Sequence, residues 1–216
     1  RRKQSGSLIW WFKKYLDVVG HDKASLLMHT DPKDPNGQDL THIMEHLGLN
    51  KGQVMISNNK ISPHDLAAMY NAADCTLNIS DAEGFGLATL ESLSCETPII
   101  VCMTGGLQEQ VTDGENWFGF GIEPTSKAVI GSQQVPYICE DRISEQDFVD
   151  TLVKLTNLTS EQRKELGQAG RQHVMKNYSF EEFEKSWVNT MSSIVEKYGS
   201  WEDRQNYERW RLLEVA

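Results

Sequence analysis

Apolar and polar residues follow two distinct patterns along the first half of the chain. Apolar side chains that recur every three or four positions predict helices, whereas short continuous apolar runs between turn residues predict strands. Helices are predicted over residues 8–19, 40–47, 62–73 and 86–95, and strands over residues 24–30, 54–56, 75–79 and 98–102. Strands that alternate with helices indicate βαβ units, so we expect an α/β fold with a parallel sheet and helices on both faces.

The pattern changes in the second half. From Gly121 to Asp141 neither period persists, and we expect an irregular excursion, a kind of long loop that often makes contacts. Helical spacing then returns, most clearly from Phe180 to Tyr198. The Ser-Trp-Glu-Asp sequence after Gly199 predicts a last helix over about residues 200–213. We therefore expect one domain over residues 1–199, followed by a C-terminal helix within residues 200–216.

Composition narrows the classes of protein that fit. The chain has 216 residues, of which 39% are hydrophobic, as is usual for a folded globular protein. Its net charge of −10 argues against nucleic acid as the main partner, because binding to a phosphate backbone requires a basic face. No apolar run is long enough to span a membrane, and the start does not resemble a signal peptide. Four cysteines without C-x-x-C spacing favour free thiols in a reducing, cytoplasmic compartment.

The most informative segment is the turn between the strand at 75–79 and the helix at 86–95. Gly84 and Gly86 allow the backbone to approach a ligand, and the free amides at the start of the helix favour an anion such as phosphate. Glu83 and Glu91 stand on either side of this turn, and a carboxylate accepts hydrogen bonds from adjacent hydroxyls of a sugar or ribose. The turn follows the carboxyl end of a strand, where ligands bind in open parallel sheets. These residues fit a ligand that contains a sugar, a diphosphate and a ribose, although a plain turn with a capping and a solvated acid fits the same short pattern.

The longer sequence from Glu83 to Asn116 resembles the donor-site signature of retaining glycosyltransferases of the GT-B fold, family 4 (group 1). In that family two glutamates separated by seven residues are followed by a proline-led strand, a Gly-Gly turn, and an acid before a valine. The chain has the corresponding residues in this order: Glu83, Glu91, Pro98, Gly105, Gly106, Glu109 and Val111. The segments ISPHDLAAMYNAADC (61–75) and YSFEEFEKSW (178–187) also resemble the family. Glu96 and Trp117 depart from it, because the family usually has glycine at both positions.

The resemblance implies a role for each matching residue. Glu83 would hold the hydroxyls of the transferred sugar, and Lys3 would neutralise the diphosphate leaving group, with Arg1 or Arg2 as its arginine companion. Glu91 would bind the ribose. The remaining donor-binding groups would be the backbone amides of Gly84, Phe85, Gly86 and Leu87, and the stretch Asn59, Lys60, Ile61 and Ser62 beside the nucleobase.

The same resemblance implies a Rossmann-like domain that is one half of a GT-B enzyme. The other half would supply the acceptor site, contact the C-terminal tail, and provide any peripheral attachment to a membrane. We expect a hexosyl transfer from a nucleotide-diphosphate sugar with retention of configuration, without a cofactor or catalytic metal. The chain by itself is expected to bind the donor but not to transfer the sugar.

Several alternatives remain open from the sequence. A non-catalytic nucleotide-binding module, or an epimerase or phosphorylase of the GT-B type, would carry similar residues. His42 and His46 form an H-x-x-E-H pattern that could bind zinc, but the neighbouring apolar positions favour surface histidines on a helix. A glycosidase pair formed by Glu83 and Glu91 would leave the glycine turn and Lys3 without a purpose.

Overall fold

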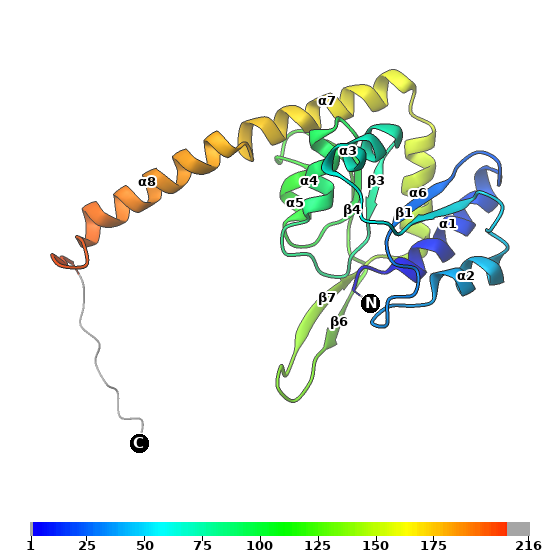
Figure 1. Ribbon diagram of the computed structural model, residues 1–216, viewed down its shortest axis with the longest axis horizontal. Helices are drawn as coiled ribbons and strands as arrows, with labels where there is room; N and C mark the ends of the chain where they lie inside the picture. The colour runs from blue at the N-terminus through cyan, green and yellow to red at the C-terminus, as the bar shows by residue number, and fades with distance from the viewer. Residues whose placement is uncertain (1, 207–216) are drawn as a thin grey trace. The chain divides into compact units, whose positions relative to one another are not determined.

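The computed structural model describes residues 2–206 of the chain (Figure 1). Its helices are α1 (Ser5–Val19), α2 (Leu40–Leu47), α3 (Pro63–Ala72), α4 (Leu87–Ser94), α5 (Leu107–Val111), α6 (Glu145–Thr156), α7 (Ser160–Asn177) and α8 (Phe180–Tyr198). Its strands are β1 (Leu26–His29), β2 (Val54–Ser57), β3 (Thr76–Asn78), β4 (Ile99–Cys102), β5 (Gly119–Ile122), β6 (Ser126–Ile130) and β7 (Ile138–Arg142).

The strands that alternate with helices pair in parallel, as expected. β1 pairs with β2, and β3, β4 and β5 form a second parallel sheet in that order. Helices α3, α4 and α5 lie on one side of the second sheet, and α1 and α6 lie on the other (Figure 1). The α/β fold class with a parallel sheet and helices on both faces is therefore confirmed.

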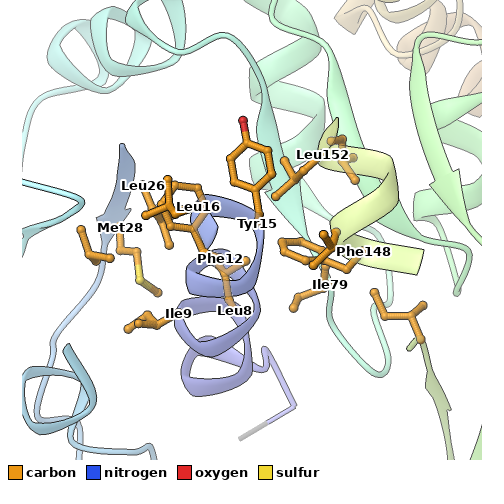
Figure 2. Packing of buried hydrophobic residues seen from close by; sticks show 14 of the residues in the cluster. Leu8, Ile9, Phe12, Tyr15, Leu16, Leu26, Met28, Ile79, Phe148 and Leu152 are labelled. Carbon is orange, nitrogen blue, oxygen red and sulfur yellow. The ribbon is translucent and has the colours of Figure 1, made fainter. Parts of the chain in front are cut away.

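One hydrophobic core joins the two parallel sheets (Figure 2). Helix α1 lies at its centre, because its apolar face packs against β1 on one side and α6 on the other. Trp11 of α1 contacts Phe148 of α6 with their ring centroids 5.6 Å apart, and the hydroxyls of Tyr15 and Thr156 are 2.6 Å apart. The apolar residues at helical spacing before Gly20 thus form the buried face of α1. Packing of this face holds the N-terminal residues beside the sheet.

The segment from Gly121 to Asp141 is not an irregular excursion, and this prediction is wrong. It contains the end of β5 and an antiparallel hairpin in which Ser126 of β6 pairs with Arg142 of β7. Most hairpin residues are exposed or only partly buried, so neither strand shows the alternation that identifies a strand with one buried face. Pairing between the two strands defines the hairpin where sequence periodicity does not.

The last part of the described chain forms a separate compact unit that begins at Met175, within α7. Helix α8 starts at Phe180, after Ser179, whose side chain caps the helix by accepting a hydrogen bond from the Glu182 backbone, and it ends before Gly199. Residues 200–206 form bends and an isolated bridge between Gly199 and Arg204, so the expected last helix does not begin at Ser200. The rest of that expected helix lies outside the described residues. None of the helices described here is long and apolar enough to cross a membrane.

Candidate functional site

The glycine turn between β3 and α4 is held in place by a side chain of α5. Gly86 has a φ of +91°, a conformation that favours glycine, and it precedes α4 without a side-chain cap. The Gln110 side-chain amide of α5 donates to the Phe85 carbonyl at 2.7 Å, and its Oε1 accepts from the Thr89 hydroxyl at 2.6 Å. These bonds, one buried and one partly buried, fix the turn in position while Phe85 and Leu87 keep exposed side chains.

The Gly-Gly turn after β4 lies directly against the backbone of Glu83 and Gly84. The Gly106 amide donates to the Gly84 carbonyl at 3.2 Å. A Cβ atom on Gly105 would lie 1.7 Å from the Glu83 carbonyl oxygen, which no side chain could accommodate. The two glycine-containing turns therefore form one packed unit at the carboxyl ends of β3 and β4.

Lys3, Arg2 and Glu83 come together at this unit, although 80 residues separate Lys3 from Glu83. The Asp81 amide donates to the Arg2 carbonyl at 2.9 Å, which aligns the N-terminal segment with the turn. Lys3 Nζ donates to Glu83 Oε2, and Arg2 Nη1 lies 3.5 Å from Glu83 Oε1 and donates to the Ala82 carbonyl at 2.6 Å. The two predicted cations thus flank the first predicted carboxylate.

The ionisation of Glu83 follows from these neighbours. Its side chain is only 9% exposed, and burial alone would raise the pKa of the carboxyl. The hydrogen bond and charge of Lys3, together with Arg2, outweigh burial and lower the pKa of Glu83 below its ordinary value. Glu83 is therefore a carboxylate at neutral pH, ready to accept hydrogen bonds.

Glu91 lies on α4, and the glycine turn separates it from Glu83 along the chain. Its carboxylate accepts a hydrogen bond at 2.9 Å from the hydroxyl of Tyr70, which belongs to α3. The predicted residues Asn59, Lys60, Ile61 and Ser62 lie in the loop between β2 and α3. Ser62 caps α3, since its hydroxyl accepts from the Asp65 amide at 3.1 Å. Helix α3 therefore links this loop to Glu91: Ser62 caps the start of the helix, and Tyr70 near its end contacts Glu91.

The base of the β6–β7 hairpin adds a group of charged residues that the sequence analysis did not identify. The Asp141 amide donates to the Asp81 carbonyl at 2.7 Å, and the Asp141 carboxylate accepts from the Thr104 hydroxyl at 2.8 Å. Asp141 therefore links the turn after β3 to the turn after β4. Next to it, Arg142 donates to Glu140 at 2.6 Å and lies 3.5 Å from the Asp81 carboxylate. In the sequence the only signal is the run of charges at residues 140–142, which matches no motif.

Both departures from the glycosyltransferase pattern lie where the chain turns tightly. Glu96 has a φ of +61°, so the backbone keeps a glycine-like conformation although the residue is glutamate. Trp117 is 48% exposed and lines a cavity of about 630 Å³ beside β5, together with Gly119, Phe120, Gly121, Leu158, Gln162, Glu165, Leu166 and Ala169.

The next question is whether side chains that could bind a metal, including the two histidines of the H-x-x-E-H pattern, lie close together. Within residues 2–206, no three His, Cys, Asp or Glu side chains are grouped in a way that could hold a metal ion. The His46 ring stacks on Trp10 with centroids 6.0 Å apart, which gives this histidine of the H-x-x-E-H pattern a packing role.

Known proteins provide an independent comparison. Residues 15–173 match the family described as Glycosyl transferases group 1. A D-inositol 3-phosphate glycosyltransferase of Corynebacterium urealyticum is 27% identical over 161 residues, which are 74% of this chain and 31% of that relative. The chain spans 31% or less of the length of the curated relatives compared.

Solved structures agree in fold. Sucrose-phosphate synthase from Thermosynechococcus elongatus superimposes with a TM-score of 0.67 at 21% identity, covering 91% of this chain and 43% of that one. A mutant of TarM from S. aureus, in complex with fondaparinux, alpha-GlcNAc-glycerol and UDP, gives a TM-score of 0.66 at 18% identity, covering 88% of this chain and 33% of that one. Because the family match covers most of the sequence, the chain belongs to the glycosyl transferases group 1 family and has the α/β fold of a GT-B glycosyltransferase domain.

Proposed function

We propose that this chain is the C-terminal, donor-binding half of a family 4 glycosyltransferase that binds a nucleotide-diphosphate sugar. The observation that carries the proposal is the meeting of Lys3, Arg2 and Glu83 beside the glycine turn. Two cations and the amides of Gly84–Leu87 suit a diphosphate, whereas Glu83 suits the hydroxyls of a sugar. This combination explains why cations and a carboxylate from distant parts of the sequence converge on one turn.

The proposed chemistry is mainly electrostatic. Cleavage of the bond between the sugar and the phosphate leaves negative charge on the diphosphate, which Lys3, Arg2 and the turn amides would stabilise. Lys3 donates a hydrogen bond to Glu83 in the structure, so a diphosphate would compete with Glu83 for this cation. Glu83 would then be free to accept hydrogen bonds from the sugar. Transfer of a hexose with retention, without a metal, is part of the same proposal.

A second domain would complete the enzyme in this proposal. The curated relatives are much longer than the chain, and the relative from Corynebacterium urealyticum is a D-inositol 3-phosphate glycosyltransferase. We therefore propose that acceptor binding, any attachment to a membrane surface and the docking of residues 200–216 depend on that second domain. A cytoplasmic location belongs to the same proposal. UDP is a reasonable first ligand, because TarM was solved in complex with it.

Glu91→Ala tests the donor site. Hydrogen bonds to a charged group contribute about 1.5–3 kcal/mol, so loss of the Glu91 carboxylate should weaken binding of a nucleoside diphosphate about tenfold or more. The measurement is isothermal titration calorimetry with UDP, GDP and ADP. Glu45→Ala, which changes an exposed glutamate on α2, is the matched control and should leave affinity unchanged. Equal affinity of the Glu91→Ala variant and the unaltered chain would argue against the ribose-binding role.

The requirement for a second domain is tested by a transfer assay. The purified 216-residue chain, incubated with a radiolabelled nucleotide sugar and candidate acceptors, should give no transferred sugar. Rapid sugar transfer by this chain alone would contradict the division of the site between two domains.

A further inference from the structure

Tyr70 has a fixed position at both its main chain and its side chain. Its carbonyl accepts from the Thr97 hydroxyl at 2.8 Å, and Thr97 is buried at 3% exposure just after α4. At the other end of the residue, the Tyr70 hydroxyl donates to Glu91 Oε2 at 2.9 Å. The half-buried tyrosine therefore joins α3 both to α4 and to the segment that follows α4.

The hydroxyl of Tyr70 is suited to act only as a donor here. Burial, and then the hydrogen bond to Glu91, raise the pKa of the phenol above its ordinary value. The proton therefore stays on Tyr70 throughout the physiological range, while a carboxylate oxygen of Glu91 acts as the acceptor. This bond has one direction, and it restrains a side chain that would otherwise sample several rotamers in solvent.

We propose that Tyr70 is a positioning residue for nucleotide binding, because its hydroxyl holds the Glu91 carboxylate in the orientation that accepts hydrogen bonds from the ribose hydroxyls. This inference rests on the donor site of the proposed function. Tyr70 engages Oε2, and a carboxylate has further lone pairs on both oxygens for a ligand. Restraining the carboxylate before the nucleotide arrives lowers the entropy lost on binding.

The arrangement also gives α3 a role in the site. The loop proposed to flank the nucleobase, Asn59–Ser62, leads into this helix through the Ser62 cap. Tyr70 near the other end of α3 contacts the carboxylate proposed to bind the ribose. One helix thus connects the two parts of the site that would recognise the nucleoside.

Tyr70→Phe tests the inference, because it removes the hydroxyl and keeps the ring. UDP, GDP and ADP are titrated calorimetrically into the unaltered chain, and the tightest of the three is compared with its 2′,3′-dideoxy counterpart. Tyr70→Phe should weaken binding of the ribonucleotide about three- to tenfold, less than Glu91→Ala, because the carboxylate remains and only its restraint is lost. The dideoxynucleotide lacks the hydroxyls that Glu91 would bind, so its affinity should not change in the variant.

A double-mutant cycle provides the second measurement. In a Glu91→Ala background, Tyr70→Phe should have no further effect on ribonucleotide affinity. An equal loss for the ribonucleotide and the dideoxynucleotide, or an additive loss in the double variant, would overturn the positioning role and leave the proposed function in place. Unchanged ribonucleotide affinity in Tyr70→Phe would do the same. If the unaltered chain binds none of the three nucleotides, the proposed function and the inference fall together.

Discussion

Glu96 has a backbone conformation that residues other than glycine rarely adopt, with a φ of +61°. Helix α7 prevents it from relaxing, because Gly167 packs against the Glu96 carbonyl so closely that a Cβ there would lie 1.8 Å from the oxygen. The Glu96 side chain lies 3.8 Å from Arg171, but both side chains are about half exposed, so this ion pair contributes little. Glycine is usual in the family at this position because it adopts this conformation without strain. This chain has a glutamate in the same conformation.

Glu96→Gly should therefore stabilise the fold. A left-handed conformation costs a residue with a Cβ about 1 kcal/mol, so the free energy of unfolding should rise by up to about that amount. Urea denaturation monitored by circular dichroism measures the change. Glu96→Ala is the control, since it removes the ion pair with Arg171 but keeps the Cβ, and it should not stabilise the chain. A Glu96→Gly variant no more stable than Glu96→Ala would show that φ at residue 96 carries no such cost.

Single residues also show what the sequence can and cannot indicate. The family resemblance implies that Glu83, Lys3 and either Arg1 or Arg2 share one donor site, and in the structure Arg2 and Lys3 both lie against Glu83. Their role in donor binding stays a prediction. Asp81 and Asp141 could not be predicted in the same way, because their contact depends on a hairpin that carries no periodic signal. Residues that match a motif are predictable, whereas residues that support them from another element are not.

At the level of elements, the β6–β7 hairpin supports the two turns of the site. Through Asp141 it binds the backbone after β3 and the Thr104 side chain after β4. Thr104 is 5% exposed, so its hydroxyl depends on this bond for a partner. The hairpin and the two turns should respond together when the bond is removed.

Thr104→Val removes the hydroxyl with little change in shape. Loss of the bond leaves the Asp141 carboxylate without this donor, and we expect the free energy of unfolding to fall by about 1–2 kcal/mol. Binding of a nucleoside diphosphate should weaken as well, because the turns are less firmly held. Thr125→Val removes an exposed hydroxyl, 3.1 Å from the Arg142 carbonyl at the same hairpin base, and should change stability by less than about 0.5 kcal/mol. Similar losses in the two variants would contradict a specific role for the Thr104–Asp141 bond.

The elements themselves were predictable where apolar runs or helical spacing mark them. The strands β1 to β4 and the helices between them follow from apolar runs and helical spacing. β5 was missed because two of its four residues are glycines and give no apolar run. It is a strand because it pairs with β4, where Gly119 lies so close to Ile99 that a Cβ would be 1.9 Å from the carbonyl oxygen. Tertiary pairing decides this element, and a local pattern cannot reveal it.

At the level of the whole molecule, the described chain comprises two compact units. Helix α8 of the second unit carries exposed apolar side chains at helical spacing: Phe180, Phe183, Trp187, Met191, Ile194 and Tyr198.

The chain has a net charge of −10, yet Arg2 and Lys3 lie beside the glycine turn. Attraction of an anionic ligand must therefore be local, and added salt should weaken it.

The most direct test of the proposed donor site is a calorimetric titration that separates the diphosphate from the nucleoside. The unaltered 216-residue chain is titrated with UDP, GDP and ADP, and then with uridine, guanosine and adenosine. At least one diphosphate should bind with a stoichiometry of about one, and its nucleoside should bind at least about tenfold more weakly, because only the diphosphate engages Lys3, Arg2 and the turn amides. Failure of all three diphosphates to bind, or equal affinity for a diphosphate and its nucleoside, would contradict the assignment of this turn as a nucleotide-sugar site.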